Sequence, residues 1–227
     1  MKSAVSGCSK VFSWRPQVSD RIQKLAAYVR PNGIVYDLCC DHGQIGLAAW
    51  DRLPLRSLIF VDQAPRALEA LRKELEARGL AADQRIQVKA CAAELLQIAE
   101  EPADFIIAGV GCRTMVNILK KLFSKGLGRH RLILCPEKNY FAVRSYLIEL
   151  GYGMIAEDVV SQVGRYREII VIEAKGGPIH LMGEGYSQQD DPLLQNFAAS
   201  LRSWHQGISA KRQGSLRPQP VARPYLA

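Results

Sequence analysis

Short apolar runs alternate with amphipathic segments along most of the chain. The apolar runs are five or six residues long, which is typical of buried strands rather than of helices. Between them, apolar residues recur at helical spacing, as in Ile22, Leu25, Ala26 and Val29. The pattern predicts strands over residues 34–38, 57–61, 85–89, 103–108 and 131–135. It predicts one helix after Ser19 and others over residues 43–53, 65–78, 92–100, 114–125 and 139–150.

The order of these elements predicts an α/β fold. Strands that are separated by helices of this length form βαβ units, and such units build a parallel sheet. Two further apolar segments, near residues 153–163 and 168–173, follow one another without a helix and predict an antiparallel hairpin. We therefore expect a Rossmann-like class I methyltransferase fold: a seven-stranded, mostly parallel sheet with a terminal antiparallel hairpin and a small helical C-terminal appendage.

Composition divides the chain into four parts. Gly176, Gly177 and Pro178 are typical of a linker, and residues 192–205 have the pattern of one amphipathic helix. After Gly207 the chain is rich in Arg, Pro, Gln and Ser, which predicts disorder. We expect a basic N-terminal arm (1–17), a main domain (18–174), a short helical appendage (175–206) and a basic, disordered tail (207–227).

The distribution of charge and the spacing of cysteines indicate the binding partners and the cellular compartment. Residues 1–30 carry six Lys and Arg against one Asp, residues 205–227 carry four bases and no acid, and the rest is nearly neutral. Basic ends suit a polyanion such as RNA, or they serve only as solubilising tails. None of the six cysteines forms a C-x-x-C pair, so we expect reduced thiols, a cytoplasmic location and no metal site. No apolar run approaches the ~20 residues of a membrane span, so we expect no membrane partner.

The residues that follow the strands are the candidates for chemistry, because α/β sheets bind ligands at the carboxyl ends of their strands. Asp37, in the first strand, is a candidate for orienting the next loop or for binding the amino end of a ligand; its other possible role is to cap that loop. Asp62 ends the second strand, where an acidic residue commonly binds both hydroxyls of a ribose. Asp62 also suits the cap of the helix that starts at Pro65.

Two further turns carry polar or glycine candidates. Gly109 and Gly111 follow the fourth strand, and this spacing suits close approach to a flat ligand or base, or else a simple tight turn. Asp41 and His42 are the polar pair nearest the expected reacting centre, although surface Asp-His pairs are also often structural. Gly43 is the glycine that remains in a turn that is usually glycine-rich.

Taken in order, these residues resemble the bacterial TrmK family, the tRNA (adenine(22)-N1)-methyltransferases. The likeness covers roughly residues 18–173 and continues more weakly to about residue 197. It rests on the opening V-S-D-R-I-Q-K-L-A-A-Y-V, then on Y-D-L-C-C-D-H-G, I-I-A-G-V-G-C, L-I-L-C-P and R-E-I-I-V-I-E. At the corresponding places the family shows S-D-H, A-G-M-G-G and L-I-L-Q-P.

The resemblance implies methyl transfer from S-adenosylmethionine to N1 of an adenine in tRNA. The positions that it assigns to the cofactor are Asp37, Cys39, Gly43, Asp62, Gln63, Ala92 and Gly109. The positions that it assigns to catalysis are Asp41 and His42, and those for substrate binding are Gly111, Glu137 and Arg144. Because N1 of adenine is already nucleophilic, such an enzyme mainly needs in-line positioning and a carboxylate that offsets the charge developing on the base.

The chain departs from the family pattern around the expected cofactor. Cys39 and Cys112 stand where the family has glycine, and Cys91-Ala92-Ala93 replaces a polar, glycine-containing segment. Cys135 and Glu137 replace the Gln and Asn beside the later proline. The family's long helical C-terminal domain is also shorter here.

Three functions therefore stay open. The first is an S-adenosylmethionine-dependent methyltransferase acting on tRNA as a cytoplasmic monomer, and the retained Asp37, Asp62 and Asp41-His42 favour it. The second is a catalytically inactive relative that binds RNA or a protein partner, which the changes from glycine to cysteine favour. The third, a nicotinamide-dependent oxidoreductase, is opposed by the terminal hairpin and by the absence of a G-x-G-x-x-G turn. We favour the first.

Overall fold

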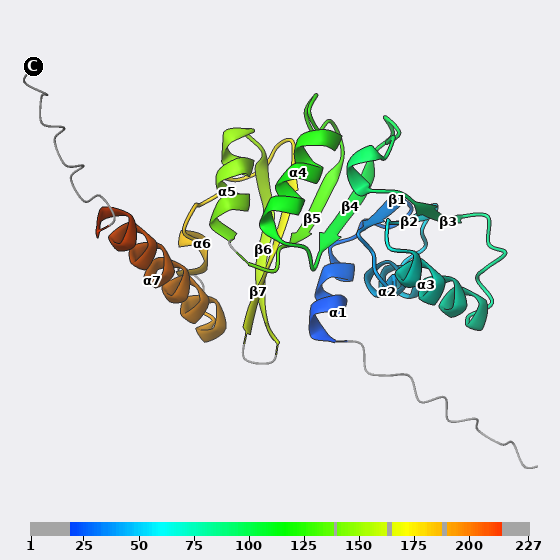
Figure 1. Cartoon of the computed structure of the whole chain (residues 1–227), viewed down its shortest axis with the longest axis horizontal. Coiled ribbons are helices and arrows are strands. Elements are labelled where there is room, and N and C mark those ends of the chain that lie inside the picture. Colours follow the sequence, from blue (N-terminus) through cyan, green and yellow to red (C-terminus); the bar gives the residue numbers. More distant parts are fainter. Residues whose placement is uncertain (1–18, 139, 163–164, 188–189, 215–227) are drawn as a thin grey trace, which may run out of the picture.

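One twisted sheet organises the computed structural model, which describes residues 19–138, 140–162, 165–187 and 190–214. Its seven strands lie in the order β3-β2-β1-β4-β5-β7-β6 (Figure 1). β7 pairs antiparallel with both β5 and β6, and the other neighbours are parallel, so the predicted sheet is confirmed. The strands are β1 (Ile34–Leu38), β2 (Ser57–Asp62), β3 (Ile86–Ala90), β4 (Ala103–Ala108), β5 (Arg131–Cys135), β6 (Gly153–Gln162) and β7 (Arg165–Glu173).

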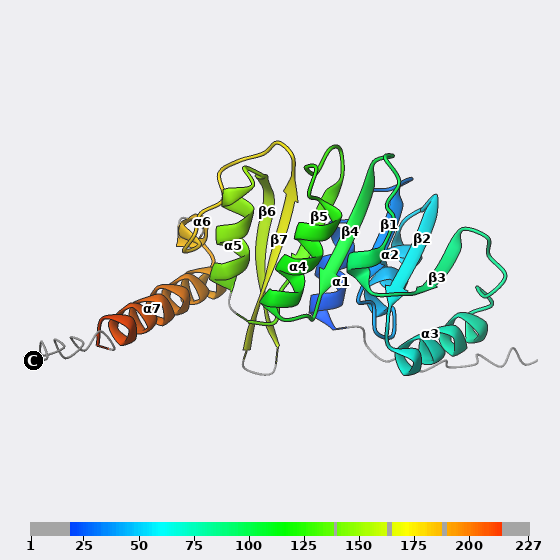
Figure 2. The same ribbon diagram turned by 45° about the horizontal axis from the view of Figure 1, so that its top comes forward.

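Helices cover both faces of the sheet (Figures 1 and 2). They are α1 (Asp20–Ala27), α2 (Gln44–Arg52), α3 (Pro65–Ala77), α4 (Cys112–Leu122) and α5 (Tyr140–Glu149), with one 3-10 turn, η1 (Ala93–Leu95). α1, α2 and α3 enclose one apolar cluster around Leu25, Phe60 and Leu71. η1, α4 and α5 enclose a second cluster around Phe105 and Ile118 on the opposite face. The two clusters are the core that holds the turns of the site in place.

The order in which the chain adds strands to the sheet reverses between β1 and β4, which are parallel neighbours near its middle. From β1 the chain runs outward through β2 to β3, and it then returns to β4 on the other side of β1. Loops diverge at such a switch point and leave space for a ligand at the carboxyl ends of the strands. α1 also begins at this edge, which is the lower one in Figure 1. The site expected from the sequence therefore lies at this edge.

The terminal hairpin reaches beyond the sheet at the same edge. β7 pairs with β5 only where Ile170–Ile172 lies opposite Leu132–Leu134. The preceding residues of β7, Arg165–Glu168, therefore extend past the carboxyl end of β5 and pair with β6 alone. This projection flanks the turn that follows β5.

The C-terminal segment differs from the sequence prediction. Two helices, α6 (Glu184–Ser187) and α7 (Pro192–Gly214), follow the hairpin, and α7 continues past residue 207, where disorder was predicted. A single glycine inside a helix costs only about 1 kcal/mol, and the residues after Gly207 include good helix formers. Phe197 and Leu201 of α7 pack with Val159 and Tyr186. The N-terminal arm, residues 1–17, and residues 215–227 lie outside the described part of the chain.

The helix predicted over residues 92–100 is also wrong. Only η1 forms, and the chain then runs irregularly to β4. Ala93 and Leu96 are buried but Leu95 is largely exposed, so the segment buries too few apolar side chains to offset the cost of nucleating a helix. Among the described helices, none is long and apolar enough to cross a bilayer.

Candidate cofactor and acceptor site

The turn after β1 is tied to the end of β2 by the Asp62 carboxylate. Asp62 Oδ2 accepts the Asp41 N–H at 2.9 Å, and Oδ1 accepts the Ala64 N–H at 2.8 Å. The Cys40 N–H donates to Val61 O at 3.2 Å. Asp62 thus orders the turn before α3 and fixes the backbone of Asp41, but it does not cap the helix, whose N-cap is Ala64 without a side-chain hydrogen bond. A carboxylate has about four acceptor sites, so capacity remains for further donors.

The turn between β1 and α2 has an unusual backbone. Cys39, Asp41 and Gly43 have φ angles of 53°, 51° and 68°, in the left-handed region. A side chain other than glycine pays roughly 1–2 kcal/mol there, so Cys39 adopts a glycine-like conformation at a cost. At Gly43 the restriction is also steric, since a Cβ would lie 2.6 Å from Leu71 Cδ1. The backbone of the turn at Gly43 therefore packs directly against the core side chains.

Asp37 lies beneath this turn and is almost completely buried. Its Oδ2 accepts the Gly46 N–H from the first turn of α2 at 2.9 Å. Burial raises the pKa of the carboxyl to about 7; the Gly46 hydrogen bond opposes that rise, and the charge of Asp62 adds to it. Asp37 therefore titrates near neutral pH, where a nearby cation strongly favours its charged form.

Three carboxylates act electrostatically on the thiol of Cys39. Burial, and then the negative charges of Asp62, Glu94 and Asp37, together raise the pKa of this thiol to about 11. Glu94 lies in η1 and accepts a hydrogen bond from Asn117 at 2.9 Å. The sequence did not single out Glu94 as a site residue. Its position after the third strand, two residues from Ala92, places it at the edge where ligands bind. The negative potential suits a cationic ligand and makes Cys39 a poor nucleophile.

The turns after β4 and β5 are joined by backbone hydrogen bonds. Gly109 N–H donates to Cys135 O at 3.0 Å, and Glu137 N–H donates to Val110 O at 3.0 Å. Gly109 has a φ of 74°, so its left-handed backbone favours glycine. A Cβ on Gly111 would meet no atom within 4 Å, so packing does not require glycine there. These turns form a fixed, open ledge, which we call the acceptor ledge (Gly109–Gly111 and Cys135–Glu137).

Asp41 and His42 lie on the exposed side of the β1 turn. His42 Nδ1 is 2.6 Å from Asp41 Oδ1, and the two side chains are 58% and 73% exposed. Asp41 is therefore held through its backbone, by Asp62, while its carboxylate faces solvent. Gln63 and Ala92 follow β2 and β3 at the same edge. Within the described ranges, no three His, Cys, Asp or Glu side chains are grouped to hold a metal ion.

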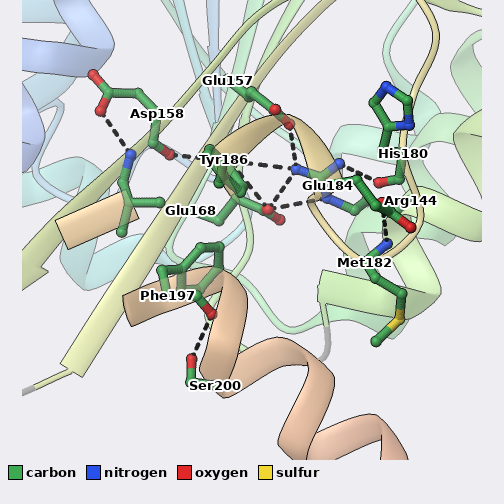
Figure 3. A network of polar contacts seen from close by, with 11 residues as sticks. Arg144, Glu157, Asp158, Glu168, His180, Met182, Glu184, Tyr186, Phe197 and Ser200 are labelled. Carbon is green, nitrogen blue, oxygen red and sulfur yellow. Dashed lines mark hydrogen bonds and ion pairs between the residues drawn. The ribbon is translucent and has the colours of Figure 1, made fainter. Parts of the chain in front are cut away.

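Arg144, which the resemblance assigned to substrate binding, lies away from the acceptor ledge. Its side chain in α5 is fully buried in a polar network at the hairpin (Figure 3). The guanidinium donates to Glu168 Oε1 at 2.7 and 3.0 Å, to Glu157 Oε2 at 2.7 Å and to His180 O. Its charge is thus neutralised by carboxylates of β6 and β7. Arg144 docks the C-terminal segment onto the hairpin instead.

Comparison with known proteins agrees with the fold. A relative from Bacillus subtilis (strain 168), named tRNA (adenine(22)-N(1))-methyltransferase, is 25% identical over 199 residues, which are 85% of this chain and 82% of the relative. A Streptococcus pneumoniae structure in complex with S-adenosyl-L-methionine has a TM-score of 0.67 at 23% identity, covering 87% of this chain and 91% of that one. TrmK of M. capricolum with S-adenosyl-homocysteine has a TM-score of 0.65 at 16% identity, covering 89% of this chain and 90% of that one.

A comparison with models of whole protein families gives the same fold. The family model described as "Methyltransferase domain" matches residues 18–170, which include the sheet up to β7 and every turn of the site. The chain therefore belongs to the methyltransferase domain family.

Proposed function

We propose that this protein transfers a methyl group from S-adenosylmethionine to N1 of an adenine in tRNA, and that it does so in the cytoplasm. The observation that carries the proposal is the hydrogen bond from Asp41 N–H to Asp62, which joins the expected ribose-binding and base-facing residues in one turn. This turn lies at the switch point of the sheet, next to the acceptor ledge. The name of the B. subtilis relative supports the choice of substrate, and the S-adenosyl-homocysteine bound to the M. capricolum relative supports the choice of cofactor.

The residues around the β1 turn fit S-adenosylmethionine. The cofactor supplies a methyl group on a positively charged sulfur, and it also carries an ammonium group. Asp37, Asp62 and Glu94 provide the negative charge that favours such a cation, as their combined effect on Cys39 indicates. Asp62 keeps acceptor capacity for ribose hydroxyls, and the left-handed backbone at Cys39 and Gly43 lets the turn lie close to a ligand.

Asp41 is the residue that we assign to the acceptor base. N1 of adenine carries no proton, so the reaction needs no general base, but the base becomes positively charged as the methyl group arrives. The Asp41 carboxylate, held through its backbone, offsets that charge. His42 contacts Asp41 Oδ1 and limits the orientations of the carboxylate. The target base has to leave its stack to reach the ledge.

A direct assay tests the function. The full chain is incubated with labelled S-adenosylmethionine and unmodified tRNA transcripts, and the digested nucleosides are analysed by mass spectrometry. We expect 1-methyladenosine, and a transcript in which guanosine replaces the target adenosine should stay unlabelled. Cofactor binding by calorimetry without any methylated nucleoside would instead support the inactive, RNA-binding relative.

Cofactor affinity should depend on pH through Asp37. Its pKa of about 7 lies above the ordinary value of 3.8, so the free protein holds a proton here below neutrality. A cationic cofactor favours the charged carboxylate, and binding must expel that proton. We expect the Kd for S-adenosylmethionine to fall up to ~10-fold per pH unit between pH 5 and 7, and then to level off.

Calorimetry in buffers of different ionisation enthalpy measures both the affinity and the released proton. Asp37→Asn is the matched variant, because it keeps the shape and removes the titration. It should bind the cofactor weakly and with a flat pH profile. An unchanged slope in Asp37→Asn would assign the titration to another group.

A further inference from the structure

An arginine of α1 lies beside the acceptor ledge, and the methyl-transfer chemistry above does not use it. Arg21 belongs to the first turn of α1, which begins at the site edge of the sheet (Figure 1). A Cβ placed on Gly109 would lie 3.8 Å from Arg21 Nη1. The guanidinium is therefore close to the turn after β4, on the face of the sheet that α1 covers.

A second arginine reaches the ledge from the projecting part of β7. Arg167 Nη1 donates to Glu137 O at 2.8 Å. Along a strand alternate side chains share a face, so Arg165 and Arg167 point the same way as Ile169. Ile169 packs in the cluster that α1 and α2 enclose, so both arginines lie on the face of Arg21.

Both guanidinium groups act on the Cys135 thiol. Burial raises the pKa of the Cys135 thiol to about 11, and the positive charges of Arg21 and Arg167 both act against that rise. Arg21 and Arg167 are thus close enough to one residue of the ledge to influence the same atom. The positive potential here contrasts with the negative potential around Cys39, on the cofactor side.

In the described part of the chain, these basic groups lack the carboxylate partners that other arginines have. Within the described residues no carboxylate forms an ion pair with Arg21, Arg165 or Arg167, whereas Arg30, Arg78 and similar residues are paired. Arg21 Nε and Ser19 Oγ, at the start of α1, are buried without a hydrogen-bond partner. Unsatisfied buried donors are rare in proteins and indicate a missing acceptor.

We propose that Arg21 and Arg167 form an anion-binding pair that holds the RNA phosphodiester next to the methylated adenosine. This inference rests on the proposed function and specifies how the substrate is placed. Neighbouring strands lie about 4.8 Å apart, so β7, three strands from β1, is roughly 14 Å from the turn assigned to the cofactor. A carboxylate of the cofactor does not span that distance to Arg167, whereas a polynucleotide backbone passes both arginines. Arginine also binds phosphate oxygens in a bidentate manner.

The test compares five full-length proteins: the wild type, Arg21→Gln, Arg21→Lys, the double variant Arg21→Gln/Arg167→Gln, and Arg72→Gln. Arg72 is exposed in α3, two turns from the start of that helix, so its variant loses the same charge away from the ledge. Fluorescence anisotropy gives the Kd for labelled tRNA at several salt concentrations, and calorimetry gives the Kd for S-adenosylmethionine. Methylation assays give kcat and KM.

We expect the double variant to bind tRNA at least ~10-fold more weakly and to lose about 1 unit of salt slope per arginine. Its KM for tRNA should rise accordingly, while its cofactor affinity stays within about twofold of the wild type. Arg72→Gln should match the wild type, and Arg21→Lys should keep most of the salt slope because the charge remains. If the two arginines only supported the fold, the dependence of tRNA affinity on salt concentration would not change.

Two outcomes overturn the inference. One is equal tRNA affinity and salt slope in the wild type and the double variant. The other is a loss of cofactor affinity with unchanged tRNA binding, which would assign Arg21 to the cofactor's carboxylate. If tRNA binding depends on the pair but the wild type forms no methyladenosine, the proposed function fails while the anion-binding pair stands.

Discussion

Asp41→Ala is expected to lower kcat for methyl transfer to tRNA at least ~100-fold while leaving S-adenosylmethionine binding largely intact. The carboxylate is exposed, and its backbone N–H is held by Asp62 at 2.9 Å, so it faces the space above the turn without supporting the core. Its loss removes the charge that offsets the developing positive base, an effect expressed in the transition state. Single-turnover methylation with saturating cofactor measures it.

Asp41→Asn separates charge from backbone geometry. Asp41 has a φ of 51°, and asparagine tolerates this conformation as well as aspartate does, whereas alanine does not. We expect Asp41→Asn to lose activity by a similar factor and to melt at the wild-type temperature. Near-normal turnover in Asp41→Asn would remove the carboxylate from the mechanism.

Arg144→Met should be the most destabilising single change, with a loss of about 3–5 kcal/mol in the free energy of unfolding. Arg144 is fully buried, and without it Glu157 and Glu168 would face one another with no cation. Glu168 Oε2 already has no hydrogen-bond partner, so Glu168 cannot compensate. Denaturant unfolding of the variant and of the wild type measures the difference.

The pH dependence identifies the cause of that loss. Burial raises the pKa of Glu168, and the charge of Arg144 lowers it, so removal of Arg144 raises the pKa further. The folded variant then binds a proton at Glu168 more readily than the unfolded chain does. Lower pH therefore stabilises the folded variant, and the difference in unfolding free energy from the wild type should shrink as pH falls from 8 to 5. Lys73→Met is the control, because the Lys73–Glu69 pair is exposed and such pairs contribute little to stability. A loss below ~1 kcal/mol in Arg144→Met, at any pH, would contradict the role of the network.

Arg144 also shows where sequence reasoning reached its limit. An arginine in a helix after β5 is equally compatible with RNA binding and with a buried ion pair. Its partners, Glu157, Glu168 and the carbonyl of His180, lie 13 to 36 residues away along the chain. No local pattern predicts such a meeting; only the antiparallel pairing of β6 with β7 and the return of the C-terminal segment create it.

The alternation of apolar runs and helical patterns determined the order of strands and helices, since periodicity depends on which face each residue buries. Because parallel strands end at one edge, the same pattern also placed Asp37, Asp62 and Gly109 near one another before any coordinates. Only the tertiary structure decided the charge of the site: the burial that raises the pKa of Asp37, the approach of Glu94 to Cys39, and the arginines of α1 and β7 at the acceptor ledge. Electrostatic effects depend on distance and burial in space, and those follow from packing between elements that are remote in sequence.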